Sequence, residues 1–518
     1  MSAHASRRHS RSRGPGDRQR HSDRIRREDL EREIERLRRE IEKLREKIGE
    51  QAIKIDKQIE QIEELERQLA THKRNSTNSS KPPSSDGLAG DPRPRGRKHK
   101  SRRKPGGQPG HPGRHRDLVP ADRVEETHVV LPEKCRHCGR NLPQVPEKVR
   151  TQGEPRRHQV TEVPKIRGHV CEYQCPHVVC QCGKTTQAPL PREVQGHFGP
   201  QLTALVAYLT VVCRQPRRVV EAMLGDVLGI DISLGSTQKA WEQVSDAVAQ
   251  PYQELQDQLP REAILNVDET GWRNNGEKRQ IWALLAKTFA FFTVQETKGA
   301  EVLVALLGMA FRGILCNDRA PAYLKYHPGL MQFCWAHLKR TLLGMVDSAR
   351  SPSARRFCRD ALAMVARLFR LWHRFRGDLR DRRGGPLPID RAQLIEKSLP
   401  LQRKLFALAE AHVNHPNRDV SNFARALFSN FERLFLFLEY DGVEPTNNSV
   451  ERTLRTAVQW RKTSFGNRSA AGEQATARLL TVMQTCRMQR RHVLGYLTDA
   501  VRRHRSGLAA PSLVAPQP

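Results

Sequence analysis

The sequence predicts a multidomain α+β protein, in which a long N-terminal helix and a small cysteine-rich domain precede an α/β core with a helical insertion. Three observations predict this organisation: a heptad pattern near the N-terminus, six cysteines between residues 135 and 182, and several short apolar strands between residues 264 and 318. The chain has 518 residues, which is too many for one ordinary hydrophobic core.

The charge balance indicates a polyanionic partner. The chain carries 89 Lys and Arg against 57 Asp and Glu, a formal charge of +32. Nucleic acid fits this excess best, a membrane surface is second, and a small acidic metabolite is disfavoured. No apolar run approaches the roughly 18 to 20 residues that span a bilayer, and residues 1–27 lack a signal-peptide hydrophobic region. We therefore expect a cytoplasmic protein that does not enter the membrane.

Two different segments begin the chain. Residues 1–27 are dominated by Arg, His and Ser and predict a disordered basic arm, whereas residues 28–72 carry a heptad repeat. The a positions are Ile34, Ile41, Ile48, Ile55 and Ile62, and the d positions are Leu30, Leu37, Leu44, Gln51, Gln58 and Leu65. Ile at a with Leu at d favours a parallel coiled-coil homodimer, with a higher oligomer as the other association state. A single amphipathic helix that packs on its own chain is the alternative.

Residues 73–120 predict a basic linker rich in Pro, Gly and Ser. The segment between Arg93 and Arg116 contains ten Lys or Arg and no acid, so it can neutralise phosphates while extended. The run Arg95-Gly96-Arg97 resembles a hook that enters a narrow minor groove. The expected DNA contacts are Arg95, Arg97, Lys98, Arg102, Arg103 and Lys104. A charge run that only aids solubility is the alternative.

A zinc-binding domain is expected in residues 121–193. Cys135 and Cys138 form a C-x₂-C knuckle, and Cys180 and Cys182 form a shorter C-x-C pair. Four thiolates suit a tetrahedral structural zinc, which leaves no open position for chemistry. Other potential ligands lie close in sequence: Cys171, Cys175, His137, His169 and His177. Unligated buried cysteines are the remaining alternative.

Helices are expected in residues 194–260. Helices over residues 215–229 and 236–248, with Ser236 as the N-cap of the second, are the pattern of a helix-turn-helix that binds DNA. Ordinary packing of helices against each other explains the same pattern.

The stretch ILNVDETGWR, residues 264–273, opens the part of the chain with strand character. Strands are expected over residues 280–287 and 289–295, then a helix near residues 300–309, then an apolar strand that ends at Asp318. This order is that of an RNase H-like core, and it places Asp268 and Asp318 on neighbouring central strands. The core would comprise residues 261–345 and 446–468. Residues 346–445 predict a helical insertion, residues 469–505 two C-terminal helices, and residues 506–518 a disordered tail.

A third acid is expected on the helix that starts in TNNSVERTLR, residues 446–455. Thr446 or Asn447 can cap this helix, and Glu451 lies about one turn in. Two like charges 4 Å apart repel by about 4 kcal/mol at an effective dielectric constant of 20, so three clustered acids need cations. A two-metal magnesium site held by Asp268, Asp318 and Glu451 meets that need and supports phosphodiester chemistry. As alternatives, Asp268 and Glu269 can form a solvated turn, and Glu451 can pair with Arg455.

Several motifs in one order resemble the insertion-sequence family sixty-six transposases. They are NSSKPPSSD (78–86), KPGGQPGHPG (104–113), the cysteine knuckles, VDETGWR (267–273), NDRAPAY (317–323), FCWAHLKR (333–340), PTNNSVERTLR (445–455), RKTSFGN (461–467) and TCRMQRRHVLGYL (485–497). The resemblance covers about residues 30 to 503. Some members of that family have Asp where this chain has Thr446.

The resemblance implies a DDE-type DNA transposase. Asp268, Asp318 and Glu451 match the catalytic acids of that family, and His337 and Arg340 match its C-x-x-H-x-x-R stretch. The further candidates for phosphate contact are Arg452, Arg455 and Lys462. The implied partners are the terminal inverted repeats, target DNA and accessory proteins of the same element, in a nucleoid-associated bacterial setting. Two alternatives remain: a dimeric zinc-containing DNA-binding regulator without catalytic activity, and a nuclease that cuts without joining.

Overall fold

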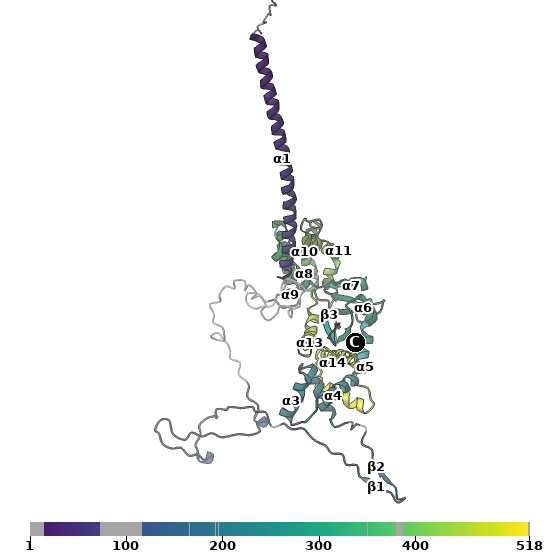
Figure 1. The fold of residues 1–518 in the computed structure, drawn as a ribbon. Helices are drawn as coiled ribbons and strands as arrows, with labels where there is room; N and C mark the ends of the chain where they lie inside the picture. Colours follow the sequence, from purple (N-terminus) through teal and green to yellow (C-terminus); the bar gives the residue numbers. More distant parts are fainter. Residues whose placement is uncertain are drawn as a thin grey trace, which may run out of the picture. The chain divides into compact units, whose positions relative to one another are not determined.

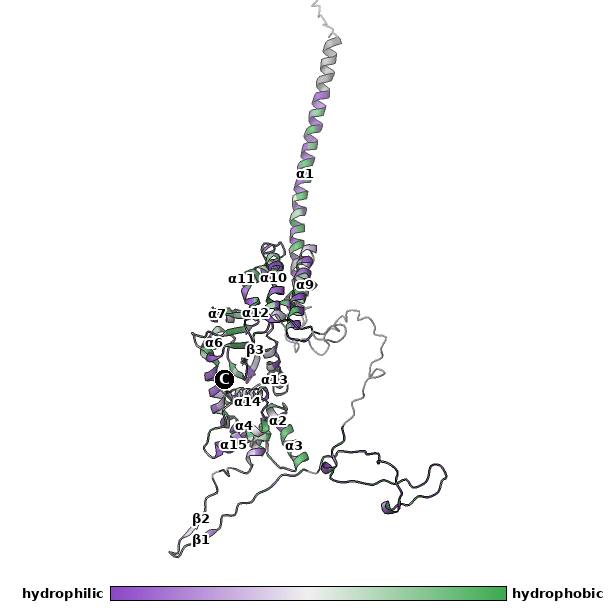
Figure 2. Ribbon diagram, turned by 180° about the vertical axis from the view of Figure 1, so that it is seen from behind, coloured by the Kyte–Doolittle hydropathy of each residue, from purple (hydrophilic) through white to green (hydrophobic). Residues whose placement is uncertain are grey.

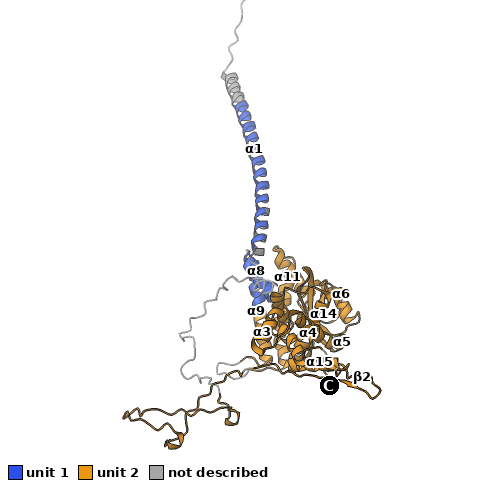
Figure 3. Ribbon diagram, turned by 60° about the horizontal axis from the view of Figure 1, so that its bottom comes forward, with its two compact units in different colours: residues 1–87, 339–362 blue, residues 88–338, 363–518 orange. Residues whose placement is uncertain are grey.

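The computed structural model describes residues 15–72, 117–164, 166–191, 193–194, 196–349, 351–379 and 387–515. The expected DNA contacts at residues 95–104 lie outside these ranges, as do residues 1–14 of the arm and 516–518 of the tail. The chain divides into two compact units: residues 1–87 with 339–362, and residues 88–338 with 363–518 (Figure 3). Within the described ranges, no helix combines the length and apolar character needed to cross a bilayer.

The first unit contains the long helix α1 (Pro15–His72). This helix begins thirteen residues before the expected start at Glu28, so the prediction of a disordered arm is wrong for residues 15–27. Pro15 suits a first helical position, and most residues that follow it are good helix formers. Polar and apolar residues are interleaved along α1 (Figure 2). The apolar heptad residues are all exposed, from 46% for Leu37 to 65% for Ile48.

The cysteine-rich region of the second unit has little regular structure. A two-stranded antiparallel hairpin pairs β1 (His177–Val179) with β2 (Thr185–Gln187). Two short 3₁₀ turns occur at Ala121–Arg123 and Pro146–Lys148. Residues 117–164 and 166–191 are otherwise mainly extended chain and turns.

Four helices follow in residues 194–260, where a helical region was expected; α3 and α4 correspond to the two helices expected over residues 215–229 and 236–248. They are α2 (Pro200–Val211), α3 (Arg217–Leu228), α4 (Leu234–Ala247) and α5 (Ala249–Gln258). Val206, Leu224 and Ala240 share one buried cluster that joins α2, α3 and α4. The N-cap of α4 is Ser233, whose hydroxyl accepts the Ser236 N–H, so the expected cap at Ser236 is wrong by three residues. Ser236 is instead the residue whose free N–H the cap satisfies.

A five-stranded mixed sheet follows these helices in the chain, in the order β5-β4-β3-β6-β7. Figure 1 shows its central strand β3, with α13 (Asn448–Ser464) beside it. The strands are β3 (Ile264–Asn274), β4 (Glu277–Leu285), β5 (Ala290–Gln295), β6 (Ile314–Asn317) and β7 (Met331–Phe333). β3, β4 and β5 form an antiparallel meander, whereas β6 runs parallel to β3 and β7 runs parallel to β6. The predicted strands and the neighbouring positions of β3 and β6 are confirmed, and β7 is an additional strand.

Helices cover this sheet and one of its edges. The short helices α6 (Ala300–Leu307) and α7 (Pro321–Tyr326) flank β6 in the sequence, and α13 (Asn448–Ser464) packs on β3 and β4. α14 (Ala470–Met488) packs on the edge strand β5. The Thr481 and Thr485 hydroxyls of α14 accept the Phe292 and Ala290 N–H groups of β5 at 2.9 and 3.3 Å. These bonds satisfy backbone groups that an edge strand otherwise leaves free.

The insertion is helical, as predicted. It contains α9 (Pro352–Phe375), α10 (Arg391–Glu410), α11 (Arg418–Ser429) and α12 (Leu436–Glu439), and it follows α8 (Trp335–Ser348). The last helix, α15 (Val493–Arg505), packs on α2 and α4. Residues 506–515 do not fit the expected disordered tail, because Leu513 is fully buried and the Tyr496 hydroxyl donates to the Pro511 carbonyl at 2.7 Å. The buried Ala510 and Leu513 and a few backbone carbonyls fix this segment.

Candidate active site

Two predicted acids lie level just beyond the paired residues of adjacent parallel strands. Ile264 of β3 pairs with Ile314 of β6, and the same register continues through Asn266 and Cys316. Asp268 lies four residues after Ile264, and Asp318 lies four residues after Ile314. Since level residues of parallel strands point to the same face of a sheet, the register brings these two carboxylates together on one face.

The chain turns sharply at Asp318. The Asp318 carboxylate accepts the Ala320 N–H at 2.9 Å, and the Asn317 side chain accepts the Arg319 N–H at 2.9 Å. Arg319 has φ of 77°, a left-handed conformation that is uncommon for residues other than glycine. Strain of this kind is often found at functional sites, where the surrounding structure enforces it.

The third acid reaches the same face of the sheet from α13. Trp272 lies on the Asp268 face of β3 because side chains alternate along a strand, and its ring contacts Trp460 of α13 with centroids 6.4 Å apart. The start of α13 is also fixed to this strand, because the Asn447 side chain donates to the Val267 carbonyl at 2.8 Å. Asn447 is the N-cap residue, but its side chain makes no capping bond within α13. Glu451 therefore lies in the first turn of a helix whose start is hydrogen-bonded to β3 at Val267, one residue before Asp268.

His337 and Cys334 support this helix start. His337 Nδ1 is 3.6 Å from a Glu451 carboxylate oxygen, and ligand atoms of Cys334, His337 and Glu451 lie within 4.8 Å of one another. Burial raises the pKa of Cys334 to about 11, so it is a thiol at neutral pH. Its sulfur accepts the Asn447 N–H at 3.1 Å. These contacts orient Glu451 and the helix that carries it.

The electrostatics indicate that the three acids share one site. Burial, first, and then the negative charges of Asp318, Glu269 and Glu451 raise the pKa of Asp268 well above its usual range. A buried carboxyl group surrounded by three others is unfavourable as an anion unless a cation joins it. The charges of Asp318 and Glu451 thus act on Asp268, although among the described residues these three acids do not form a group with ligand atoms within 4.8 Å of one another. Carboxylate oxygens are the ligands that suit a hard divalent cation such as Mg²⁺.

A fourth carboxylate, Glu269, lies on the opposite face of β3. It pairs across the strands with Trp282, and it accepts a 2.5 Å hydrogen bond from the Tyr323 hydroxyl of α7. Burial, first, and the charge of Asp318 raise the pKa of Glu269, whereas the bond from Tyr323 opposes that shift. The pair was not predicted from the sequence, because its members are 54 residues apart and each lies in a motif already interpreted through Asp268 or Asp318.

The predicted phosphate contacts are placed only in part. Arg452, Arg455 and Lys462 are exposed on α13, and their spacing of three and seven residues puts them on one face of the helix. Arg340 belongs to the other compact unit, so it is not placed relative to the acids.

The predicted zinc ligands form two separate pairs. Backbone N–H groups of Cys138 and His137 lower the pKa of Cys135, and the backbone N–H of Cys182 similarly lowers the pKa of Cys180. Each pair therefore lies in a turn that favours a thiolate. Among the described residues, the two pairs do not come together as one four-cysteine cluster.

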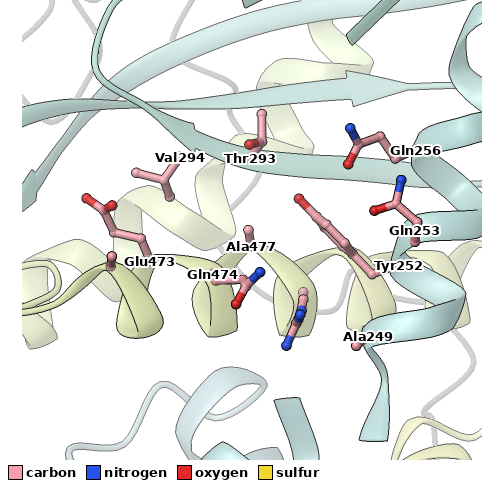
Figure 4. Close-up of a pocket in the computed structure, with 11 residues that line it drawn as sticks. Ala249, Tyr252, Gln253, Gln256, Thr293, Val294, Glu473, Gln474 and Ala477 are labelled. Atoms are coloured by element: carbon pink, nitrogen blue, oxygen red, sulfur yellow. The ribbon is translucent and has the colours of Figure 1, made fainter. Parts of the chain in front are cut away.

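A cavity elsewhere in the second unit is not part of this site. It has a volume of about 290 Å³ and lies between α5, β5 and α14, where Tyr252, Gln474 and Glu473 line it (Figure 4). None of the three predicted acids lines it, and Glu473 is paired with Arg279 at 3.4 Å.

Comparison with known proteins identifies the family. The family model described as "Transposase IS66 family" matches residues 195–475, which is more than half of the chain. The chain belongs to the IS66 family of transposases. The matched range includes all three acids of the site. A second model, of a family of unknown function, matches residues 18–117 of this transposase, which include most of α1 and the basic linker.

Two relatives come from Sinorhizobium fredii (strain NBRC 101917 / NGR234). The uncharacterized protein y4qI is 29% identical over 240 residues, which are 44% of the transposase and 42% of the relative. The uncharacterized protein y4hP is 23% identical over 418 residues, which are 74% of the transposase and 73% of the relative. The chain thus spans less than half the length of the first of these relatives.

Proposed function

We propose that this transposase binds the inverted-repeat ends of an insertion sequence, cleaves DNA there, and joins the freed 3′ ends to target DNA. Asp268, Asp318 and Glu451 are the proposed catalytic acids. The observation that carries this proposal is the level position of the two aspartates on adjacent parallel strands, with Glu451 close enough to raise the pKa of Asp268.

We propose a domain organisation that agrees with these catalytic acids. Residues 261–345 and 446–468 form an RNase H-like catalytic core, which the mixed sheet and α13 support. Residues 346–445 form its insertion, residues 121–193 a zinc-binding domain, and residues 194–260 a DNA-binding helical region. The basic linker, at residues 73–120, adds sequence-independent contacts with phosphates.

The three acids would hold two magnesium ions. When bound, such ions lower the pKa of the attacking water or hydroxyl and offset negative charge on the phosphodiester. The acids themselves supply the oxygen ligands, and the sheet and α13 fix their spacing before DNA arrives. His337 orients Glu451 from 3.6 Å, and the Asp318 turn holds its carboxylate through the Ala320 N–H. No protein nucleophile is required.

The exposed face of α13 would position the DNA. Arg452 follows Glu451 directly, and Arg455 and Lys462 continue the same face, so a phosphate backbone can follow the helix to the acids. These side chains provide charge, whereas sequence recognition would come from the helical region of residues 194–260 or from the linker.

A strand-transfer assay tests the proposal. The full chain is incubated with Mg²⁺, a labelled duplex that ends in the inverted repeat of its element, and a supercoiled plasmid as target. We expect labelled DNA joined to the plasmid, because a transposase uses the freed 3′ hydroxyl as the next nucleophile. Cleaved but unjoined label would identify a nuclease, and specific binding without cleavage would identify a regulator; either result contradicts the proposal.

The coiled coil is proposed to pair two copies of this chain through the exposed heptad face of α1. Replacing Ile48 and Ile55 by lysine puts charges in the seam and should shift the protein from dimer to monomer in analytical ultracentrifugation. Ile53 provides a matched control, because it is 59% exposed on the same helix but lies outside the a and d positions. Ile53→Lys should leave the dimer intact; equal behaviour of all variants would contradict a heptad seam.

Zinc is proposed to bind Cys135, Cys138, Cys180 and Cys182, since the turns at both pairs favour thiolates. We expect elemental mass spectrometry of the purified protein to find about one zinc per chain. That zinc should be lost in Cys135→Ser and in Cys182→Ser. Cys213→Ser is the control, because Cys213 is exposed and lies outside both pairs. Zinc that persists in Cys182→Ser would assign the fourth ligand to another residue, such as Cys175.

A further inference from the structure

Phe465, at the end of α13, is unusually exposed. Its exposed fraction is 83%, whereas the other phenylalanines with exposed side chains in the described ranges, Phe428 and Phe406, reach 40% and 37%. An exposed phenylalanine gains nothing from the hydrophobic effect within its own chain. A lone exposed apolar residue is common on protein surfaces, so the exposure alone decides nothing.

The backbone of Phe465 is the second observation. Its φ of 60° is in the left-handed region, and its N–H donates to the Arg461 carbonyl at 2.8 Å to end the helix. Glycine or asparagine usually occupies this position of a helix end, and a bulky side chain there is strained. The chain thus places a phenylalanine where both the exposure of its side chain and the conformation of its backbone are unfavourable.

The turn that presents the ring is rigid. The Asn467 N–H donates to the Arg273 carbonyl at 2.9 Å, and the Asn467 carbonyl accepts the Asn275 N–H at 2.8 Å. The Asn467 side chain accepts the Trp272 indole N–H at 2.6 Å. A Cβ at Gly466 would lie 2.2 Å from the Arg273 carbonyl oxygen, so the turn packs directly on the end of β3. Phe465 is consequently held in place while its ring remains in solvent.

Several basic residues lie close to Phe465 in the sequence. Lys462 and Arg468 are exposed on either side of Phe465, and the Arg461 guanidinium donates to the Gly271 carbonyl of β3. Burial, first, and the nearby charge of Arg273 lower the pKa of Arg461. The Thr463 hydroxyl also donates to the Arg214 carbonyl at 3.4 Å, which places the loop before α3 beside this helix end. A polyanion fits this surface better than an apolar protein partner.

We propose that Phe465 is a base-stacking site, on which an unpaired or extruded base of the DNA substrate rests its aromatic face. This inference rests on the proposed DNA transfer activity. Stacking on an exposed aromatic ring is sequence-tolerant, because every base has such a face, and nearby cations hold the adjoining phosphates. Phe465 lies fourteen residues after Glu451, about 21 Å along a helix. The stacked base would therefore lie about six base-pair steps from the cleaved phosphate.

Two variants of the full chain, both made with Asp268→Asn so that DNA is not cut, test the proposal. Phe465→Asn removes the ring but suits the left-handed backbone, and Phe465→Trp enlarges the stacking surface. The probes are a duplex with a four-nucleotide single-stranded overhang and the same duplex with blunt ends. We expect Phe465→Asn to bind the overhang DNA roughly ten- to a hundredfold more weakly, with an unchanged or higher melting temperature. Phe465→Trp should bind at least as tightly as the parent.

A cross-link identifies the contact directly. Irradiation of 5-iododeoxyuridine in the overhang should join it to Phe465 of the parent, as mapped by mass spectrometry. Phe428→Asn is the matched control, since it removes an exposed phenylalanine from α11 and should leave DNA affinity unchanged. A lower melting temperature in Phe465→Asn would make the ring structural. Three results for Phe465→Asn would each overturn base stacking. They are an unchanged affinity for the overhang DNA, an equal loss of affinity for blunt and overhang DNA, and a loss of self-association alone. These binding and cross-linking measurements do not require strand transfer. They therefore test base stacking even if the strand-transfer assay contradicts the proposed reaction.

Discussion

Asp268→Asn is expected to abolish strand transfer, by about a thousandfold or more, while raising the melting temperature of the metal-free protein. A loss of this size corresponds to about 4 kcal/mol of transition-state stabilisation, which is reasonable for a metal-binding carboxylate. The gain in stability has the same origin as the loss of activity, because the Asp268 carboxylate is buried among three others that oppose its ionisation. Asparagine keeps the shape of the side chain and removes the charge.

The pH dependence of this gain follows from the raised pKa of Asp268. At a pH above about 4, the unfolded chain ionises this group freely, whereas the folded protein must either keep a proton or accept the repulsion. The wild-type chain is therefore penalised as the pH rises toward the folded pKa, and the penalty is absent below the unfolded pKa. The advantage of Asp268→Asn should grow as the pH rises above about 4 toward the folded pKa and should shrink as the pH falls toward about 4.

Calorimetry with and without Mg²⁺ measures both sides of this prediction. In EDTA, the melting temperature of Asp268→Asn should exceed that of the parent by roughly 2 to 4 °C for each kcal/mol of repulsion removed. Mg²⁺ should stabilise the parent more than the variant, because only the parent has the complete ligand set. Asp226→Asn, at an exposed position of α3, is the control and should change neither quantity. A variant with normal Mg²⁺ stabilisation would show that Asp268 is not a ligand.

The sequence was sufficient to predict β3 and β6 because each begins as an apolar run that leads to a carboxylate, although β3 continues past Asp268 to Asn274. It was also sufficient for α13, where Glu451 follows a capping sequence. It could not predict β7, because Met331–Phe333 has only three residues and no pattern distinguishes so short a strand from a loop. The buried Leu513 was missed for a related reason: the apolar residues of this short tail are interrupted by Gly and Pro and follow no helical or strand periodicity, and the burial of Leu513 depends on a surface formed far away in the chain.

The candidate site shows the same division between local and long-range information. The acids could be predicted because apolar runs that lead to a carboxylate and polar residues that precede a helix are local signals. The contacts that orient them could not, since the bond from Asn447 to Val267 and the Glu451–His337 contact join segments separated by more than a hundred residues. The left-handed conformation of Phe465 was equally inaccessible, because its residue type argues against that conformation and only the packing of the turn on β3 enforces it. Strained positions are where local rules are expected to fail.

The bond between Tyr323 and Glu269 leads to the second major prediction. Tyr323 lies in α7, five residues after Asp318, whereas Glu269 directly follows Asp268, so the bond ties the two aspartate-bearing segments together on the far face of the sheet. Tyr323→Phe keeps the ring, which packs edge-on against Trp282 with centroids 6.2 Å apart, and removes only the hydroxyl. We expect strand transfer to fall roughly ten- to a hundredfold, with a higher Mg²⁺ concentration needed for half-maximal rate, because the aspartates are then less well positioned.

Three comparisons separate positioning by this bond from a general loss of stability. Tyr326→Phe is the matched control, because its hydroxyl lies on the same short helix but donates to the Gly308 carbonyl at 2.7 Å, so its Mg²⁺ dependence should be normal. Glu269→Gln should be mild, since the amide oxygen can still accept the Tyr323 hydroxyl. Combining Tyr323→Phe with Glu269→Gln should recover stability, because no unpartnered carboxylate stays buried, but should not recover the normal Mg²⁺ requirement. If the double variant regained both, Tyr323 would act only by neutralising a buried charge, and the two aspartates would owe their spacing to the strand register alone.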